Sequence, residues 1–383
     1  MTLVVVGASL AGLRAVESAR RTGYRGRIVL IGAEEHLPYD RPPLSKAFLD
    51  ADGPGEVTPF HSETVLRDEL GVELMLGAPA ESLDTGAREV TVAGAPVRYD
   101  ALVIATGATA RRLPGARTLR TAEDAVAVRA ALDDGARTVV IGAGFIGSEV
   151  ASAARKRGLP VTIVEASAVP LARAVGEVAG AELAGLHRAA GTELRLATEV
   201  TGVADGVRLS TGEVLPADLV VAGIGAVPAT GWLEGSGLTL HERDRGVVCD
   251  ATLSAGPPGV YAAGDVAHVA NPLFDGEPMR PEHWTNAAEQ GAAAARHALD
   301  PASARALEAV PYFWSDWYGH RIQFVGTPRA DEVVSAGGVT LYRRGDRIVG
   351  ALTVDRPREI MKYRRRVAAR AEWGEALAFA GAA

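Results

Sequence analysis

Hydrophobic and polar positions near the start of the chain follow two different spacings in turn. Residues 3–6 form a continuous apolar run, which is typical of a buried strand, and residues 7–12, "GASLAG", form a glycine turn. A helix is predicted from this turn to about Arg21, and a second strand over residues 27–32, "RIVLIG". The pattern therefore predicts a strand–turn–helix–strand unit, followed by a Pro-rich loop at 36–47.

The same unit recurs at residues 138–165, where "VVIGAGFIGSEVASA" covers 139–153. The two glycine turns begin at Gly7 and Gly142, 135 residues apart, which indicates a duplication on the scale of a domain. Apolar strands at 98–115 and 217–228 resemble each other, and another at 258–267 stops at Gly-Asp. After residue 301 the chain is rich in aromatic residues, alternates like strands and ends in a helical tail.

These elements predict an α/β fold with two Rossmann-like dinucleotide-binding domains and a small α+β C-terminal domain. The first domain is expected to be discontinuous, formed by residues 1–107 and 226–305. Residues 108–225 are expected to form the second domain and residues 306–383 the third.

Composition excludes several other kinds of protein. Hydrophobic residues make up 48% and charged residues 23% of the chain, and the net charge is −7, so nucleic-acid binding is not expected. The longest uncharged stretch, 219–233, is interrupted by Gly and Pro, and the first strand begins at Leu3, so neither a membrane span nor a signal peptide is expected. One cysteine and eight scattered histidines predict no disulfide, no metal site and a cytoplasmic location.

The first glycine turn departs from the G-x-G-x-x-G pattern, because Ser9 stands where the second glycine is usual. Gly7 and Gly12 keep the other two positions, and a serine hydroxyl can face a phosphate. The N-terminus of the following helix offers free N–H groups to phosphates, and Glu34, 22 residues past Gly12, can hold a ribose diol. Tight packing is the alternative explanation for the glycines.

The second glycine turn keeps the full pattern with Gly142, Gly144 and Gly147, and Glu165 follows 18 residues after the last glycine. Ala166-Ser167-Ala168 offers no arginine to a 2′-phosphate, so NADH is expected over NADPH. Asp265 ends the apolar strand of "VYAAGDVA", where it can accept hydrogen bonds from the ribityl chain of a flavin or cap a helix.

Seven motifs in order, GASLAG, PYDRPPLSK, ATGA, GAGFIGSE, GIG..P, AAGDV and FWSD, extend along the whole chain. In this set the chain resembles the oxygenase-coupled NADH-dependent ferredoxin reductases, which have a glutathione-reductase-like fold. The resemblance implies tightly bound FAD, NADH as co-substrate and an acidic [2Fe–2S] ferredoxin as partner. It also implies a monomer or weak homodimer with no nucleic-acid or membrane partner.

The resemblance also assigns roles to single residues. It implies that Lys46 and Glu149 are catalytic, with the Lys46 ammonium near flavin N5. FAD-binding residues would be Gly7, Ser9, Ala11, Gly12, Glu34, Arg41, Lys46, Ala80, Ala105, Thr106, Gly107, Arg120, Gly264, Asp265 and Trp284. NAD-binding residues would be Gly142, Gly144, Phe145, Ile146, Gly147, Glu149, Glu165, Arg173, Gly223, Ile224 and Gly225.

Four of these side chains have an ordinary structural explanation as well. Glu149 is a solvated helix carboxylate in that alternative, and Arg120 is a surface arginine. Trp284 is a core tryptophan and Arg173 a charge at a helix end. Sequence alone leaves these alternatives open.

Two features limit the chemistry. Disulfide reductases of this fold need a cysteine in the segment that here reads "RPPLSKAFLD", so Cys249 is expected to be inert. Trp317 stands where the family usually has Gln. The aromatic block around it, Tyr312–Tyr318, is more often core than contact surface.

The electron acceptor is the least determined part of the prediction. Residues 343–370 hold ten Lys and Arg against three acids, including Arg343, Arg344, Arg364, Arg365 and Arg366. This run is either a solvated face or a docking site for an acidic ferredoxin. The sequence thus predicts an FAD-dependent NADH:ferredoxin reductase serving a monooxygenase or dioxygenase. The alternatives are a reductase of rubredoxin, quinone or oxygen, and an NADH-responsive redox-sensing interaction protein.

Overall fold

The computed structural model describes residues 1–382, which form two compact units. Unit 1 contains Met1–Asp40, Thr58–Thr109 and Val227–Pro311. Unit 2 contains Arg41–Val57, Ala110–Ala226 and the residues from Tyr312 onward. The C-terminal sheet groups here with the second glycine turn, and the division into three domains stays a prediction. No helix in residues 1–382 is long and apolar enough to cross a membrane.

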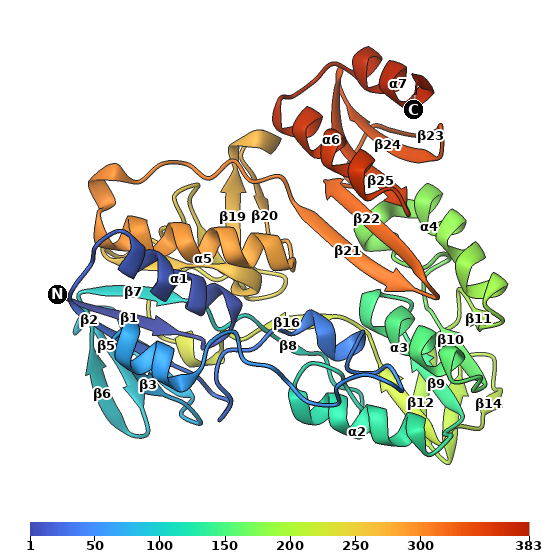
Figure 1. Ribbon diagram of the computed structural model, residues 1–383, viewed down its shortest axis with the longest axis horizontal. Helices are drawn as coiled ribbons and strands as arrows, with labels where there is room; N and C mark the ends of the chain where they lie inside the picture. Colours follow the sequence, from blue (N-terminus) through green and yellow to red (C-terminus); the bar gives the residue numbers. More distant parts are fainter. Residues whose placement is uncertain (383) are drawn as a thin grey trace. The chain divides into compact units, whose positions relative to one another are not determined.

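Unit 1 is built on a five-stranded parallel sheet whose strands are almost wholly buried. Such strands read as continuous apolar runs, which is why the sequence shows residues 3–6 as uniformly hydrophobic. The strand order is β18 (Val260–Ala262), β7 (Ala101–Ile104), β1 (Thr2–Val6), β2 (Arg27–Ile31) and β3 (Val72–Met75). Helices α1 (Leu10–Arg21) and α5 (Trp284–Leu299) lie side by side and pack against this sheet (Figure 1).

Two smaller sheets complete unit 1. One is an antiparallel meander of β4 (Ala80–Asp84), β5 (Glu89–Val92) and β6 (Ala95–Arg98). The other consists of β17 (Val247–Cys249), β19 (Ala267–Asn271) and β20 (Glu277–Met279). The segments that connect the two units contain the short strands β8 (Ala108–Ala110) and β16 (Ala226–Pro228).

Unit 2 repeats the arrangement around a four-stranded parallel sheet. Its order is β11 (Glu193–Arg195), β10 (Val161–Val164), β9 (Thr138–Ile141) and β15 (Leu219–Ala222). Its helices are α2 (Ala122–Asp133), α3 (Phe145–Lys156) and α4 (Ala172–Ala189), and a small sheet contains β12 (Val200–Ala204), β13 (Gly206–Leu209) and β14 (Val214–Leu215). β9 lies between β10 and β15 as β1 lies between β2 and β7, so the duplication is confirmed.

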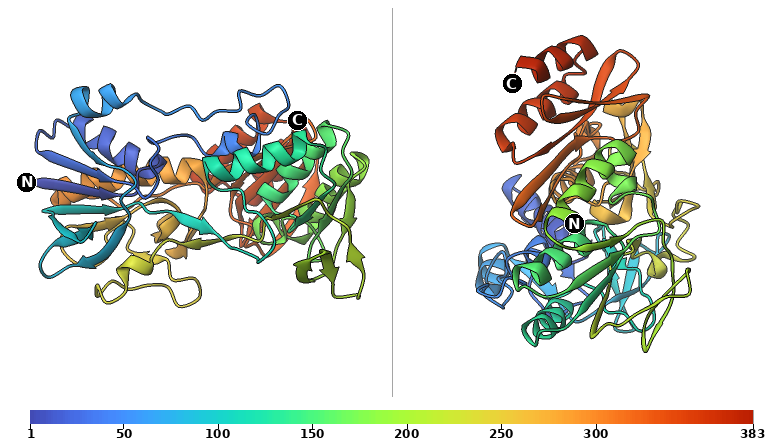
Figure 2. Two further views of the ribbon diagram at one scale, coloured as in Figure 1. Left: turned by 90° about the horizontal axis from the view of Figure 1, so that it is seen from below. Right: turned by 90° about the vertical axis from the view of Figure 1, so that its right-hand side faces the viewer.

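The C-terminal part of unit 2 is an antiparallel sheet with two helices, as predicted. The strand order is β21 (Tyr312–Trp317), β22 (His320–Gly326), β25 (Arg347–Val354), β24 (Val339–Arg344) and β23 (Glu332–Ala336). Helices α6 (Pro357–Ala368) and α7 (Trp373–Ala382) pack beside these strands, as the red segments of Figure 2 show. The predicted fold class is therefore confirmed.

The Pro-rich stretch at 36–47 is more regular than expected. It contains a 3₁₀ helix at Pro42–Ser45. Proline favours the first turn of a helix because its φ is already helical and its missing N–H would have no partner there. This turn presents Ser45 and Lys46 next to each other at its end.

Candidate cofactor-binding and redox site

The first glycine turn connects β1 to α1 and lies against the segment that follows β7, the neighbouring strand in the sheet. Gly7 has φ +121°, and a Cβ on it would lie 2.1 Å from the Ala105 carbonyl oxygen. Ser9 is the N-cap residue of α1, and its side chain makes no capping hydrogen bond. The first N–H groups of a helix have no partner within the helix, so this turn can receive a phosphate on backbone donors and the Ser9 hydroxyl.

Glu34 lies just after β2, at the same edge of the sheet as this turn. The Tyr39 hydroxyl donates to its Oε2 at 2.6 Å, which orients the carboxylate. A half-buried, oriented carboxylate at this edge suits a ribose diol.

The second glycine turn, between β9 and α3, repeats this construction. Gly142 has φ +98°, and a Cβ on it would lie 2.5 Å from the Gly223 carbonyl oxygen. The Gly223 N–H donates to Ile141 O at 2.8 Å, as the Ala105 N–H donates to Val6 O at 2.7 Å in the first turn. The predicted likeness of the two strands at 98–115 and 217–228 thus corresponds to equivalent positions in the two sheets.

Glu165 follows β10 and is tied to the second turn. Its Oε2 accepts the Ala143 N–H at 2.7 Å and its Oε1 accepts the Ser167 N–H at 2.7 Å. The carboxylate is therefore fixed beside the glycine turn. In α3, Gly144 is the N-cap residue without a side chain, and Phe145 and Ile146 begin the helix half-buried.

The predicted catalytic pair is formed in unit 2. Lys46 Nζ lies 2.8 Å from Glu149 Oε1, and the two side chains are 19% and 1% exposed. Ser45 Oγ donates to Glu149 Oε2, and Ser315 Oγ donates to Oε1 at 2.5 Å. Glu149 is therefore a buried carboxylate with three donors, and its interpretation as a solvated helix residue is wrong.

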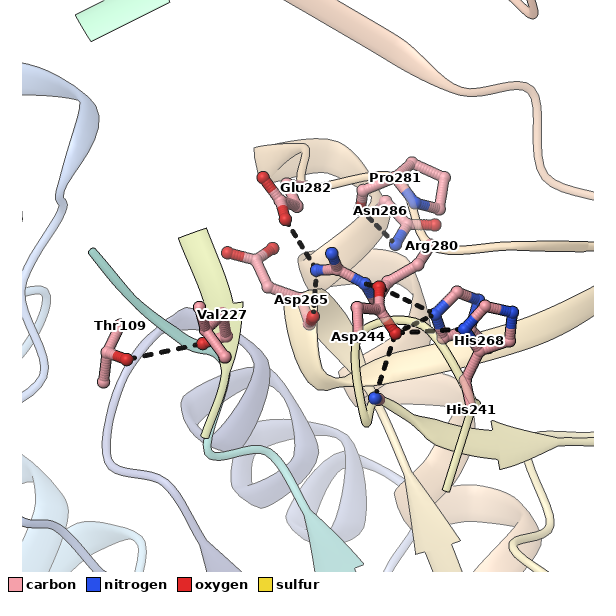
Figure 3. A network of polar contacts seen from close by, with 11 residues as sticks. Thr109, Val227, His241, Asp244, Asp265, His268, Arg280, Pro281, Glu282 and Asn286 are labelled. Carbon is pink, nitrogen blue, oxygen red and sulfur yellow. Dashed lines mark hydrogen bonds and ion pairs between the residues drawn. The ribbon is translucent and has the colours of Figure 1, made fainter. Parts of the chain in front are cut away.

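Asp265 lies in a 3₁₀ turn, Gly264–Val266. Neighbouring side chains form hydrogen bonds with the backbone of this turn. The Gln290 amide oxygen accepts the Gly264 N–H at 2.8 Å. Arg280 Nη1 donates to the Asp265 carbonyl oxygen at 2.9 Å, while its Nε donates to Asp244 Oδ2 at 2.9 Å (Figure 3). Asp265 is thus presented by a turn that is anchored on both sides.

Asp244 also gathers two histidines, which the sequence reading described as scattered. His268 Nε2 lies 2.9 Å and His241 Nδ1 3.2 Å from Asp244 Oδ1, and the rings stack with centroids 4.0 Å apart (Figure 3). Burial opposes ionisation of Asp244, but the Gly246 N–H, His268 and Arg280 outweigh it and lower the pKa of Asp244 to about 2. These two histidines are therefore not scattered in space, and their hydrogen bonds to the ionised Asp244 account for the group. The expected absence of a metal site stays a prediction.

Other predicted site residues are distributed over both units. Trp284 begins α5 and donates from Nε1 to Asp40 Oδ1 at 2.8 Å, and Thr106 Oγ1 donates to Ala229 O at 2.9 Å. The remaining unit 1 candidates lie in three places: Ala11 and Gly12 in α1, Ala80 at the start of β4, and Gly107 directly before β8.

Two FAD candidates group with the NAD candidates in unit 2, as Lys46 does. Arg41 Nη1 donates to the Arg120 carbonyl oxygen at 2.7 Å. Arg173 is exposed near the start of α4, and Gly147, Ile224 and Gly225 lie in α3 and in the segment after β15.

Comparison with known proteins assigns these features to a family. Residues 1–291 match the pyridine nucleotide-disulphide oxidoreductase model, and residues 312–381 match a reductase C-terminal model. The chain belongs to the pyridine nucleotide-disulphide oxidoreductase family. Within it, the reductase is 36% identical over 386 residues to rhodocoxin reductase of Rhodococcus erythropolis, covering 95% of this chain and 89% of that one.

Two further likenesses cover almost the whole reductase. It is 36% identical over 387 residues to the ferredoxin–NAD(+) reductase subunit of the benzene 1,2-dioxygenase system of Pseudomonas putida, covering 96% and 92% of the two chains. The reductase chain in the crystal structure of the covalent putidaredoxin reductase–putidaredoxin complex superposes with a TM-score of 0.90 at 32% identity, covering 96% and 93%. The resemblance drawn from the seven motifs is therefore confirmed.

Despite the family's description, this reductase has one cysteine. Cys249 is buried, and burial raises the pKa of its thiol to about 12. A neutral thiol is a poor nucleophile, because the thiolate is the reactive form. Ser45 and Ser315 contact Glu149 beside Lys46, and residues 41–50 contain no cysteine.

Sequence reasoning missed Ser45, Ser315 and Arg280. Ser45 and Ser315 were inside the quoted motifs PYDRPPLSK and FWSD but received no role. A signal was present for Ser315, because it lies two residues before Trp317 and alternate residues of a strand share a face. Arg280 gave no local signal, since its partners Asp244 and Asp265 are 36 and 15 residues away.

Basic residues of the 343–370 run are partly neutralised by neighbours. Arg343 pairs with Glu332 at 2.9 Å and with Asp346 at 3.6 Å. Arg366 lies 3.8 Å from Glu375 and places its guanidinium over the Phe379 ring at 3.8 Å. Arg365 is exposed on α6.

Proposed function

We propose that this protein is an FAD-dependent NADH:ferredoxin reductase that supplies electrons to a [2Fe–2S] ferredoxin of a monooxygenase or dioxygenase. The observation that carries the proposal is the presence in one chain of two glycine-turn units of the same construction, together with a buried Glu149 carboxylate paired with the partly exposed Lys46. Bound FAD would supply hydride acceptance from NADH and one-electron donation to the partner. The residues of the chain bind and orient the two nucleotides.

Most of the residues assigned to FAD belong to unit 1. Ser9 and the N-terminus of α1 suit its pyrophosphate, and Glu34 suits its adenine ribose. Asp265, on its anchored turn, would accept hydrogen bonds from the ribityl chain. The other FAD-binding assignments stay part of this proposal, including Arg41, Lys46 and Arg120 of unit 2 and Trp284 of unit 1.

The NADH would be held in unit 2. Gly144 leaves the N-terminus of α3 uncovered for the pyrophosphate, and Glu165 would accept from both ribose hydroxyls. Lys46 and Glu149 would face the reacting rings. Holding the donor carbon of NADH within about 3–3.5 Å of flavin N5 would contribute to the rate by positioning the reacting atoms. The single cysteine suits the cytoplasm as its compartment.

The proposed function predicts that the purified protein is yellow. Excess NADH should bleach the flavin absorbance with no added thiol reductant present. It should then reduce a [2Fe–2S] ferredoxin from its own genome much faster than rubredoxin, a quinone or oxygen.

If an acidic ferredoxin docks on the arginines of the C-terminal sheet and α6, raising salt should slow ferredoxin reduction and spare ferricyanide reduction, since screening reaches about 10 Å at 0.1 M. Flavin reduction without turnover of any ferredoxin, and with a change of assembly, would favour a redox sensor instead.

Glu165 predicts a preference for NADH over NADPH. Hydrogen bonds to a charged acceptor are worth about 1.5–3 kcal/mol each, and a 2′-phosphate would remove one and add a like charge. The ratio of kcat/KM for NADH to that for NADPH should therefore exceed about tenfold. Glu165→Gln should narrow this ratio, whereas Gln at the exposed Glu177 should leave it unchanged. Equal kcat/KM for the two cofactors in the unmodified protein would contradict the assignment.

A further inference from the structure

β21 and the residue that follows it lie against one face of α3 at three residue pairs of unit 2. The strand buries Phe313, Ser315 and Trp317 and exposes the alternate residues more. The Phe313 ring lies 4.6 Å from the Phe145 ring, Ser315 contacts Glu149, and the Tyr318 N–H donates to Ser152 Oγ at 2.7 Å. Positions 145, 149 and 152 share one helix face, so the strand fixes the helix at the level of Glu149.

Trp317 lies at one end of a hydrogen-bond chain that connects β21 to α3. Its Nε1 donates to Ser315 Oγ at 2.8 Å, and Ser315 Oγ lies 2.5 Å from Glu149 Oε1. An indole N–H can only donate and a carboxylate can only accept. Both hydrogen bonds of the Ser315 hydroxyl therefore have one possible direction, from Trp317 through Ser315 to Glu149.

The surroundings hold the indole in place with neutral groups. Trp317 and Ser315 are both fully buried. The His187 ring lies 4.8 Å from the indole, and its Nδ1 is 2.8 Å from the Tyr318 hydroxyl. Burial lowers the pKa of His187 to about 4 and raises that of Tyr318 to about 12, so both are uncharged at neutral pH.

We propose that Trp317 is a positioning residue for the redox site, acting through Ser315 to hold the Glu149 carboxylate in the orientation in which it pairs with Lys46. The inference rests on the proposed role of Glu149 toward NADH and flavin. Oε1 receives both Ser315 and Lys46, so turning the Ser315 hydroxyl away would leave the carboxylate held by Ser45 and Lys46 alone. Its orientation, and with it the position of the Lys46 ammonium, would then change. Trp317 thus belongs to the redox site and is more than a packing residue.

The test is a cycle of variants on the FAD-loaded protein, with flavin reduction by NADH followed by stopped flow. Ser315→Ala should lower the rate constant of reduction about tenfold, and Ser315→Thr, which keeps the hydroxyl, should restore most of it. Trp317→Phe keeps a buried ring but removes the N–H, and should lower the rate constant about three- to tenfold with little change in the half-saturating NADH concentration. In the Ser315→Ala background, Trp317→Phe should change the rate constant of flavin reduction less than about twofold, because the two residues act in series.

Melting temperature provides a second readout that does not depend on turnover. The losses caused by Ser315→Ala and Trp317→Phe should be less than additive in the double variant. Trp314→Phe, on the other face of the same strand, is the matched control and should show no coupling to Ser315. Equal effects of Trp317→Phe on the rate in both backgrounds, or no effect in either, would overturn the proposal. Failure of NADH to reduce the unmodified protein would instead count against the proposed function. The melting temperatures of the single and double variants would still test the hydrogen-bond chain from Trp317 through Ser315.

Discussion

Gly142→Ala is expected to lower the rate of flavin reduction by NADH at least about 100-fold while leaving the FAD content unchanged. The glycine has φ +98°, and an added Cβ would stand 2.5 Å from the Gly223 carbonyl oxygen, a backbone atom that cannot rotate away. The turn must shift, and it carries the N-terminus of α3 and Glu149 with it. A shift of about 1 Å in a positioned group can cost about 100-fold in rate.

The matched control for this prediction is Gly158→Ala in the same unit. Gly158 also has a positive φ, +74°, but a Cβ there would meet nothing within 4 Å. Both variants suffer backbone strain of about 1–2 kcal/mol, whereas only Gly142→Ala collides. Stopped-flow reduction by NADH and the flavin absorbance of the purified variants measure the two effects separately. Similar rates in the two variants would show that strain, rather than the contact with Gly223, decides the outcome.

Removing the charge of Glu149 should have the second large effect. Glu149→Gln should lower the rate constant of flavin reduction by about 100-fold and lower the melting temperature. The carboxylate is 1% exposed, so its loss leaves the Lys46 ammonium, itself 19% exposed, without its counter-charge. Breaking such a buried pair costs about 3–5 kcal/mol, less where the remaining charge can reach water.

An exposed pair in unit 2 provides the comparison for this effect. Lys156 Nζ lies 2.9 Å from Asp50 Oδ1, with side chains 62% and 39% exposed. Asp50→Asn removes an equivalent charge from a solvated pair, which is worth about 0–1 kcal/mol, and should change neither the rate nor the melting temperature appreciably. If Glu149→Gln resembles Asp50→Asn in both measurements, the buried pair has no role in hydride transfer.

Much of the fold was readable because its signals are local. A buried parallel strand needs a continuous apolar run, and the turn that follows it needs glycine where another backbone passes within van der Waals distance. These requirements appear in the sequence around Gly7 and Gly142, and their repetition indicated the duplication. Motif order then identified the family, because Lys46, Glu149 and Asp265 occur in recognisable neighbourhoods.

Tertiary structure alone decided what surrounds those residues. Ser315 meets Glu149 across 166 positions of sequence, and Arg280 meets Asp244 across 36, so no local pattern reports either contact. The contact of His268 with Asp244 was hidden for the same reason, because it spans 24 positions, although His241 is only three residues from Asp244. The sequence by itself determined which backbone segments could bind a nucleotide, since the tight turns around Gly7 and Gly142 admit only glycine at those positions. Which side chains support Glu149 depended on the packing of β21 against α3, and side-chain pairing between distant segments is set by that packing rather than by spacing along the chain.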